Sequence, residues 1–228
     1  MNSKISIVMP VLNEAAQLAN TLRHLSISDQ EELIIVDGGS IDNTMSIARE
    51  FTGKVYETKT GRASVMNYGA GKAEGGILLF FHADCVLPDN AFRIIRETLD
   101  NHRVSAGAFL LGIDHPGLKF RLIEFGANLR SRVSSIVYGD QGIFLTKETF
   151  DKIGGYAEIP LMEDIEISQR LKKCGNVVLL KSRVKASARR WLKEGAVYTT
   201  LRDWAIAFSY SFLNVSPDKL IKKYKDVR

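Results

Sequence analysis

Short apolar runs alternate with helix-patterned stretches along residues 1–103, and this alternation constrains the fold more than any other feature. Lys4–Met9, Leu33–Val36 and Ile77–Phe81 have the apolar, partly β-branched character of buried strands. A helical pattern follows each of them, and strands joined by helical crossovers form a parallel sheet with helices on both faces. We therefore expect an α/β fold, an αβα sandwich around a mostly parallel sheet.

The second half of the chain is less regular but contains the same kinds of element. A chain of 228 residues suits one domain with a sizeable core. We expect a single domain, 1–228, with a nucleotide-binding half (1–103), a half that completes the site (104–193), and a C-terminal aromatic helix with a basic tail (194–228). The elements expected after residue 103 are strands over Ala106–Ile113, Ile143–Thr146 and Val177–Leu180, and helices over Leu118–Val133, Lys147–Ile153, Met162–Cys174 and Gly195–Leu213.

The composition is that of a soluble globular protein. Hydrophobic residues make up 45% and charged residues 25%, which excludes a disordered chain, a collagen-like repeat and a coiled coil. Cys85 and Cys174 are too few for a zinc cluster or a disulfide framework, so a reducing cytoplasm is the default location. No stretch reaches the ~18 consecutive apolar residues of a transmembrane helix. We expect a cytoplasmic protein that is soluble or lies at the inner face of the membrane.

Positive charge is concentrated in one part of the chain. The net charge is +5, and residues 170–193 contain nine basic residues and no acidic one. Such a block favours an anionic partner, namely a diphosphate, an acidic lipid surface or a nucleic acid, although a solvated surface is the simpler explanation. No helix-turn-helix, RNP-type or zinc-finger pattern accompanies the charge, so we expect no nucleic-acid partner.

Polar residues follow three of the expected strands at the points where they end. Asn13 and Glu14 follow the first, Asp37 the second, and His82 and Asp84 the strand at Ile77–Phe81. Ligands of open parallel sheets bind outside the carboxyl ends of the strands. Asn13 is also a plain candidate for a helix cap. A buried carboxylate is costly without a partner, so the two aspartates are candidates for a binding site.

The usual phosphate-binding loops are missing. Neither G-x-x-x-x-G-K-[ST] nor G-x-G-x-x-G follows the first strand, which excludes P-loop enzymes and dinucleotide dehydrogenases. A divalent cation held by carboxylates is another way to neutralise phosphate charge. Asp84 is the candidate ligand for Mn²⁺ or Mg²⁺, and Arg62 offers a fixed positive charge for the same phosphates.

Five short motifs occur in order between residues 4 and 175, and together they resemble glycosyltransferase family 2. Phe80–Asp84 stands where that family has its D-x-D motif, in the shortened H-A-D form of a small bacterial branch without membrane spans. The other four are Ser6–Glu14, Ile35–Thr44, Gly61–Ala70, and Gly154-Gly155-Tyr156 followed by Glu163-Asp164.

This resemblance implies a GT-A fold and an inverting, metal-assisted transfer of a sugar from a nucleotide-diphosphate sugar, UDP-linked, to an unidentified acceptor. Asp164 would be the catalytic base with Glu163 as its neighbour, and Asp84 would bind the metal. Without the resemblance, an ordinary helix N-terminus is the favoured explanation of the acidic pair. The residues implied at the nucleotide are Pro10, Asn13, Glu14, Asp37, Gly39, Arg62, His82 and Ala83.

The sequence departs from the family pattern at two positions. His82 replaces the first aspartate of D-x-D, and no late histidine completes a metal site. Arg189 and Arg190 stand in the corresponding segment, where we expect them to contact the diphosphate unless they end a solvated strand. Asp140 and Gln141 lie between two glycines and suit either a contact with the donor sugar or acceptor, or a simple turn.

Two other functions and three roles for the last helix stay open at this point. A sugar-phosphate nucleotidyltransferase would need a glycine-rich loop where this chain has Pro10–Glu14. A non-catalytic nucleotide-sugar or membrane-surface binding protein is suggested only by His82. The aromatic C-terminal helix suits core packing, a homodimer, or peripheral contact with a membrane, and many members of the family use lipid-phosphate acceptors.

Overall fold

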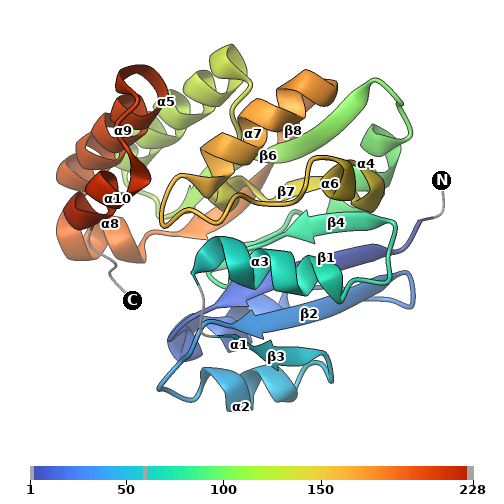
Figure 1. Cartoon of the computed structure of the whole chain (residues 1–228). Helices are drawn as coiled ribbons and strands as arrows, with labels where there is room; N and C mark the ends of the chain where they lie inside the picture. The colour runs from blue at the N-terminus through green and yellow to red at the C-terminus, as the bar shows by residue number, and fades with distance from the viewer. Residues whose placement is uncertain (1–2, 59–60, 225–228) are drawn as a thin grey trace.

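One eight-stranded sheet runs through the centre of the molecule in the order β3-β2-β1-β4-β7-β6-β8-β5 (Figure 1). The structure is a computed structural model that describes residues 3–58 and 61–224. The strands are β1 Ile5–Val11, β2 Glu31–Asp37, β3 Val55–Glu57, β4 Ile77–Phe80, β5 Cys85–Val86, β6 Val104–Asp114, β7 Ile143–Thr146 and β8 Asn176–Ser187. The helices are α1 Ala15–Arg23, α2 Thr44–Arg49, α3 Arg62–Gly71, α4 Ala91–Leu99, α5 Leu118–Ser134, α6 Lys147–Lys152, α7 Glu163–Cys174, α8 Arg189–Glu194, α9 Ala196–Leu213 and α10 Pro217–Leu220, with 3₁₀ turns η1 Gly139–Gln141 and η2 Ile221–Lys223.

The expected mostly parallel sheet is confirmed. β1 pairs in parallel with β2 and β4, β2 with β3, and β6 with β8. The antiparallel pairs are β4 with β7, β6 with β7, and β5 with β8. Val11 stands opposite Asp37 at the ends of β1 and β2. The segments that follow β1, β2 and β4 therefore begin at the same edge of the sheet.

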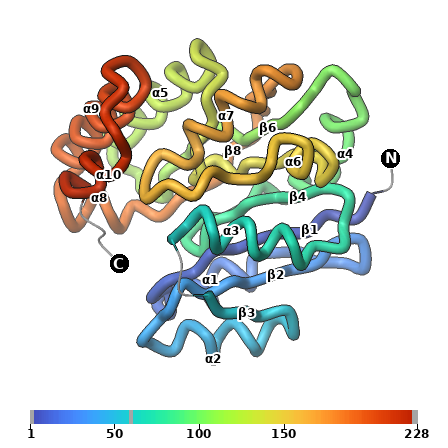
Figure 2. The backbone as a smooth tube through the Cα atoms, viewed as in Figure 1, coloured from blue at the N-terminus to red at the C-terminus, as the bar shows by residue number. Residues whose placement is uncertain are grey.

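Helices cover both faces of the sheet, which confirms the αβα sandwich. One core cluster joins the side chains of Ile7 and Met9 to apolar residues of α1, α2, α4 and α5. The other joins Val8 and Val36 to α3, α6 and α7. Alternate residues of the same strand thus enter opposite cores. Figure 2 shows the same layers as a backbone trace.

Several local expectations were wrong, and each error has a physical reason. β8 continues well past Leu180 because it pairs with β6 as far as Ser187 and also with β5 at Lys185 and Ala186. The short elements β5, α8 and α10 have too few residues for a readable period. The chain turns at Asn13 with φ 52°, and Glu14 rather than Asn13 precedes α1. The Asn13 side chain instead accepts a hydrogen bond from the Ile41 N–H at 2.9 Å.

A charged cluster around Glu32 holds elements together away from that edge. Glu32 is buried, and its carboxylate accepts hydrogen bonds from Ser6, Lys54 and the N–H of Gly75. Although burial alone would raise the pKa of Glu32, these bonds outweigh it and lower the pKa to about 2.

None of the helices that the structure describes is long and apolar enough to cross a bilayer.

Candidate active site

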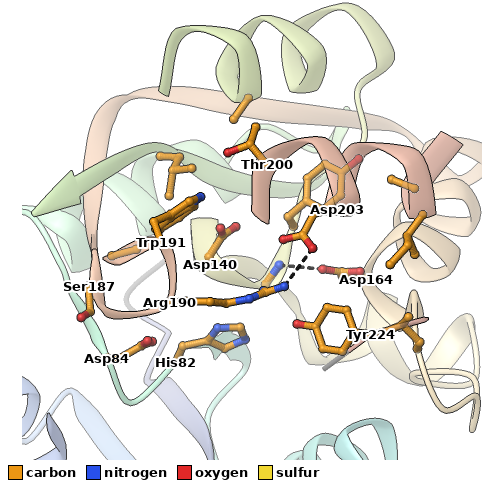
Figure 3. A pocket seen from close by; sticks show the side chains of 18 of the residues that line it. His82, Asp84, Asp140, Asp164, Ser187, Arg190, Trp191, Thr200, Asp203 and Tyr224 are labelled. Carbon is orange, nitrogen blue, oxygen red and sulfur yellow. Dashed lines mark hydrogen bonds and ion pairs between the residues drawn. The ribbon is translucent and has the colours of Figure 1, made fainter. Parts of the chain in front are cut away.

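A cavity of about 250 Å³ opens where the carboxyl ends of β1 and β4 meet the first turns of α7 and α8. Figure 3 shows the cavity from close by. Most of the sequence-predicted site residues line it. They are Pro10, Glu14, Arg62, His82, Ala83, Asp84, Asp140, Glu163, Asp164, Arg189 and Arg190.

Four predicted site residues do not line this cavity, namely Asn13, Asp37, Gly39 and Gln141. Asp37 is 1% exposed, and its carboxylate accepts hydrogen bonds from the N–H groups of Gly39 and Ser40 at 2.9 and 2.7 Å. In this structure it therefore shapes its own loop. Gln141 is buried behind the cavity wall, where its amide oxygen accepts a bond from the Tyr138 N–H at 2.9 Å.

Arg189 links the two acidic residues on the β1–β4 side of the cavity. Its guanidinium group donates to both oxygens of Glu14, at 3.2 and 2.9 Å. The same group lies 3.8 Å from a carboxylate oxygen of Asp84. Glu14 is 5% exposed, so Arg189 supplies the counter-charge that this buried carboxylate requires. These contacts fix Arg189 against the loop that follows β1.

His82 packs against a backbone that carries no side chain. A Cβ placed on Gly139 would lie 2.6 Å from the His82 Nε2 atom, so only glycine leaves room for the ring. The Gly139 N–H in turn donates to Asp164 at 3.0 Å. Gly139 thus allows a close approach to its backbone, and the approaching group is the His82 imidazole. In Figure 3 Asp84 lies on one side of His82 and Asp164 on the other.

The acidic pair begins α7, and its two members have different surroundings. Glu163 is 4% exposed, and its carboxylate lies 3.4 Å from a guanidinium nitrogen of Arg62. Burial and the neighbouring Asp164 raise the pKa of Glu163, although Arg62 acts in the opposite direction. Asp164 is only partly buried, and its second oxygen accepts the Ile165 N–H at 3.0 Å. The backbone therefore fixes a carboxylate that faces the cavity.

Asp140 points into the cavity from η1. Protein atoms surround it on most sides, so it reaches solvent only through the cavity. Burial raises the pKa of Asp140 to about 6, and the nearby charge of Asp164 adds to this, while Arg130 and Arg190 act in the opposite direction. Asp140 is thus a carboxylic acid that changes its charge close to neutral pH.

Replacing Asp140 with Asn should stabilise the protein above pH 6. The folded pKa of about 6 exceeds the ordinary 3.8, so the ionised carboxylate costs stability above pH 6, and the cost disappears as the pH falls toward 3.8. We expect a gain of roughly 2 kcal/mol at pH 8, or about 5 °C in Tm. Differential scanning calorimetry at pH 8 and pH 4 measures it, with Asp151→Asn on the exposed side of α6 as control. Destabilisation at pH 8 would contradict it.

Sequence reasoning missed much of the cavity wall on the α5–α9 side. Arg130 lies over the Tyr138 ring at 3.9 Å, and Trp204 lines the same wall. Arg190 donates to Asp203 at 2.9 Å, and its guanidinium group points toward Asp164 as well (Figure 3). No local motif marks Arg130 or Asp203, because only the packing of α5 and α9 brings them to the site. The remaining missed residues with polar or aromatic side chains are Ser187, Trp191, Thr200 and Tyr224.

The carboxylates present suit a metal ion that a substrate helps to hold. Among the residues the structure describes, no three His, Cys, Asp or Glu side chains form a group that could bind an ion alone. Mg²⁺ and similar ions are often held by one or two carboxylates together with substrate phosphates and water. Asp84, whose side chain is 29% exposed and lies beside His82 in the cavity, matches that type of site.

The arrangement agrees with a comparison against protein families, in which a model described as glycosyl transferase family 2 matches residues 6–157. The chain belongs to glycosyl transferase family 2. The match contains four of the five sequence motifs and the Gly154-Gly155-Tyr156 part of the fifth, whose acidic pair at Glu163 and Asp164 lies beyond it.

Known members of the family are similar to parts of this chain. A PGL/p-HBAD biosynthesis glycosyltransferase of Mycobacterium bovis is 41% identical over 90 residues, which are 35% of this chain and 34% of that protein. Poly-beta-1,6-N-acetyl-D-glucosamine synthase of Staphylococcus epidermidis is 28% identical over 192 residues, 73% of this chain and 45% of that protein. The chain spans about a third of the length of the first curated relatives.

Solved structures confirm the GT-A fold of this family 2 chain. The mannosyltransferase PcManGT from Pyrobaculum calidifontis, in complex with GDP-Man and Mn²⁺, has a TM-score of 0.73 at 17% identity and covers 98% of this chain and 65% of its own. TarS 1-349 of S. aureus in complex with UDP-GlcNAc has a TM-score of 0.62 at 18% identity and covers 81% of this chain and 58% of its own.

Proposed function

We propose that this chain transfers a sugar from a nucleotide-diphosphate sugar to an acceptor hydroxyl, with inversion at the anomeric carbon. One observation carries the proposal. In a family 2 chain, Asp164 faces the same cavity as Asp84 and Arg189, and two backbone N–H groups fix its orientation. A carboxylate and a cationic group that share a cavity are what a displacement of diphosphate by a hydroxyl requires.

The chemistry proposed for these residues is a single displacement. Asp164 takes the proton of the acceptor hydroxyl as the acceptor oxygen bonds to the anomeric carbon. The bond from that carbon to the diphosphate oxygen breaks at the same time, and its electron pair leaves with the nucleoside diphosphate. Arg189 and Arg190 stabilise the charge that develops on the leaving group. Glu163 holds Arg62 at 3.4 Å and so keeps a further cation at the cavity wall.

A divalent cation is part of the proposal. Asp84 would hold Mn²⁺ or Mg²⁺, which would neutralise charge on the leaving diphosphate. The solved complex of PcManGT contains Mn²⁺, which supports a metal in this fold. Because Arg189 already stands 3.8 Å from Asp84, this chain brings a fixed positive charge to the same place.

We propose UDP as the nucleotide of the donor. TarS was solved with UDP-GlcNAc and PcManGT with GDP-Man. Both ligands are nucleotide sugars, which supports a donor of this class, but their bases differ. Glu14 and Asp37 are proposed to contact the nucleoside, together with Pro10, Asn13, Gly39, His82 and Ala83. Asp140 is proposed to lie near the donor sugar or acceptor. Gln141, which is buried next to it, is proposed to support that part of the cavity.

Release of nucleoside diphosphate from a panel of nucleotide sugars tests this proposal without knowledge of the acceptor. Water replaces the acceptor hydroxyl in a slow hydrolysis, so each UDP-, GDP- and dTDP-sugar is incubated with and without Mn²⁺. We expect release from one donor class and a free sugar whose first NMR-detected anomer is inverted. A released sugar with retained configuration would exclude the single displacement. Donor binding without any release, in the presence of an acceptor extract, would favour a non-catalytic binding protein.

A further inference from the structure

Helix α5 buries polar side chains beside Phe120 and exposes a row of large apolar ones, unlike an ordinary surface helix. Its buried side carries Glu124 and Asn128, which bond to the backbone of β6. The Asn128 amide donates to the Leu111 carbonyl at 2.9 Å, and Glu124 accepts from the Ile113 N–H at 2.5 Å. Its exposed side carries an apolar row of Leu118, Leu122, Phe125, Leu129 and Val133, each between 48% and 81% exposed.

Helix α9 lies beside α5 and also exposes a row of apolar residues (Figures 1 and 2). The two helices meet where the Trp204 ring crosses Gly126, so closely that a Cβ there would lie 2.8 Å from the ring. Both helices space their exposed apolar residues by three to four positions, as one side of a helix requires. On α9 these residues are Val197, Leu201, Trp204, Phe208 and Phe212, each between 39% and 72% exposed.

These ten exposed apolar side chains belong to two helices that touch at Gly126 and Trp204, and they are called here the α5–α9 face. Core packing was one expectation for the C-terminal helix, and it is wrong for this side. Burial along α9 is confined to Ala196, Thr199, Ile206 and Ala207. Large apolar side chains exposed together on a globular protein mark a site of contact with another molecule or a membrane.

The exposed charges of α5 and of residues 192–224 are almost all positive. Within α5 and residues 192–224, all of which the structure describes, Asp218 is the only exposed acidic side chain. Glu194 and Asp203 are partly buried and paired with Arg190 and Arg202. The exposed basic side chains in the same segments are Lys119, Arg121, Arg132, Lys193, Lys219, Lys222 and Lys223.

From these observations we propose that the α5–α9 face binds the surface of a lipid bilayer that contains anionic lipids. The apolar side chains enter the boundary between headgroups and acyl chains, and the basic side chains contact the negative headgroups. The charge pattern favours a bilayer over a second copy of this chain. A two-fold dimer through this face would bring two positive rims together, which opposes association.

Co-flotation of the purified chain with vesicles tests the proposal. One set of vesicles is phosphatidylcholine alone, and the other contains phosphatidylglycerol at about a third of the lipid. We expect flotation with the anionic vesicles that weakens as salt is added, because exposed charges are screened. The double variant Phe125→Glu/Phe208→Glu should reduce the bound fraction by about tenfold or more, because two aromatic side chains that enter the bilayer are replaced by charged ones.

The matched control is Ile41→Glu, which replaces an apolar residue that is 95% exposed in the loop between β2 and α2. This variant should float as the wild type does. Thermal unfolding of each variant confirms folding, since all three positions are exposed. The proposal is overturned if the wild type ignores anionic vesicles, or if the double variant still floats. It is equally overturned if sedimentation shows a dimer that the double variant dissociates. None of these outcomes depends on glycosyl transfer.

Discussion

Replacing Asp164 with Asn should slow sugar transfer by about a thousandfold while leaving donor affinity nearly unchanged. Asparagine keeps the size of the side chain, and its amide oxygen still accepts the Gly139 N–H that now donates at 3.0 Å. The amide has no basic oxygen that takes up the acceptor proton. Nucleoside diphosphate release at saturating donor measures the rate, and isothermal titration calorimetry measures donor binding.

The matched control for this substitution is Glu166→Gln. Glu166 lies in the same first turn of α7 but does not line the cavity, and its carboxylate is bound by the Arg170 side chain at 2.7 Å. Its variant should turn over like the wild type. An unchanged rate for Asp164→Asn would remove this residue from the mechanism. A parallel loss of donor binding and rate would mean that Asp164 supports the structure of the cavity instead.

Replacing Arg189 with Ala should weaken donor binding by roughly a hundredfold, because a charge-assisted contact to the diphosphate is lost. The same change removes a cationic partner of Glu14, which is 5% exposed and accepts hydrogen bonds of 2.9 and 3.2 Å from Arg189. Two effects are therefore combined in one variant. Calorimetric titration with the nucleoside diphosphate measures the affinity, and thermal unfolding measures the stability.

A second variant separates the two effects. In Glu14→Gln/Arg189→Ala the buried group is neutral, so stability should recover while affinity stays low. Arg183→Ala is the control for loss of an arginine from a buried glutamate outside the cavity, since Arg183 pairs with Glu124 at 2.9 Å. It should bind the donor normally. If the double variant regains donor affinity, Arg189 acts only as a partner of Glu14 and the proposed contact with the diphosphate is wrong.

The sheet and the position of the cavity followed from the sequence because their causes are local. The apolar runs that became β1, β2 and β4 are each readable within a few residues, and parallel pairing brings their carboxyl ends to one edge. The motif residues Glu14, His82 and Asp84 stand directly after those strands. Their meeting in one cavity was therefore predictable without any knowledge of side-chain contacts.

The basic block between residues 170 and 193 shows what a charge count leaves undecided. Lys181, Arg183 and Lys185 alternate with the buried Val184 and Ala186 along β8 and point to solvent. This period of two was visible in the sequence. For these three residues the simpler explanation, a solvated surface, is the one that the structure supports. Only the two arginines at the start of α8 line the cavity.

Contacts that join distant segments could not be predicted in this way. Arg189 meets Glu14 across 175 positions of the chain, and Trp204 reaches Arg130 only because α9 packs on α5. The outward apolar side of α5 was hidden for a different reason. A hydrophobic period indicates a helix but does not say which side faces the protein, and here the buried side bonds to β6 through polar groups.

The most direct test of the central claim is a thermal-shift panel of nucleoside diphosphates and nucleotide sugars, with and without Mn²⁺ or Mg²⁺. A ligand at about 100 times its Kd adds about 2.7 kcal/mol of stability, or roughly 5–10 °C for a chain of this size. We predict such a shift with one nucleotide, larger with the metal, and loss of the metal's contribution in Asp84→Asn. No shift with any nucleotide, in protein shown to be folded, would contradict the proposal that this cavity is a nucleotide-sugar site.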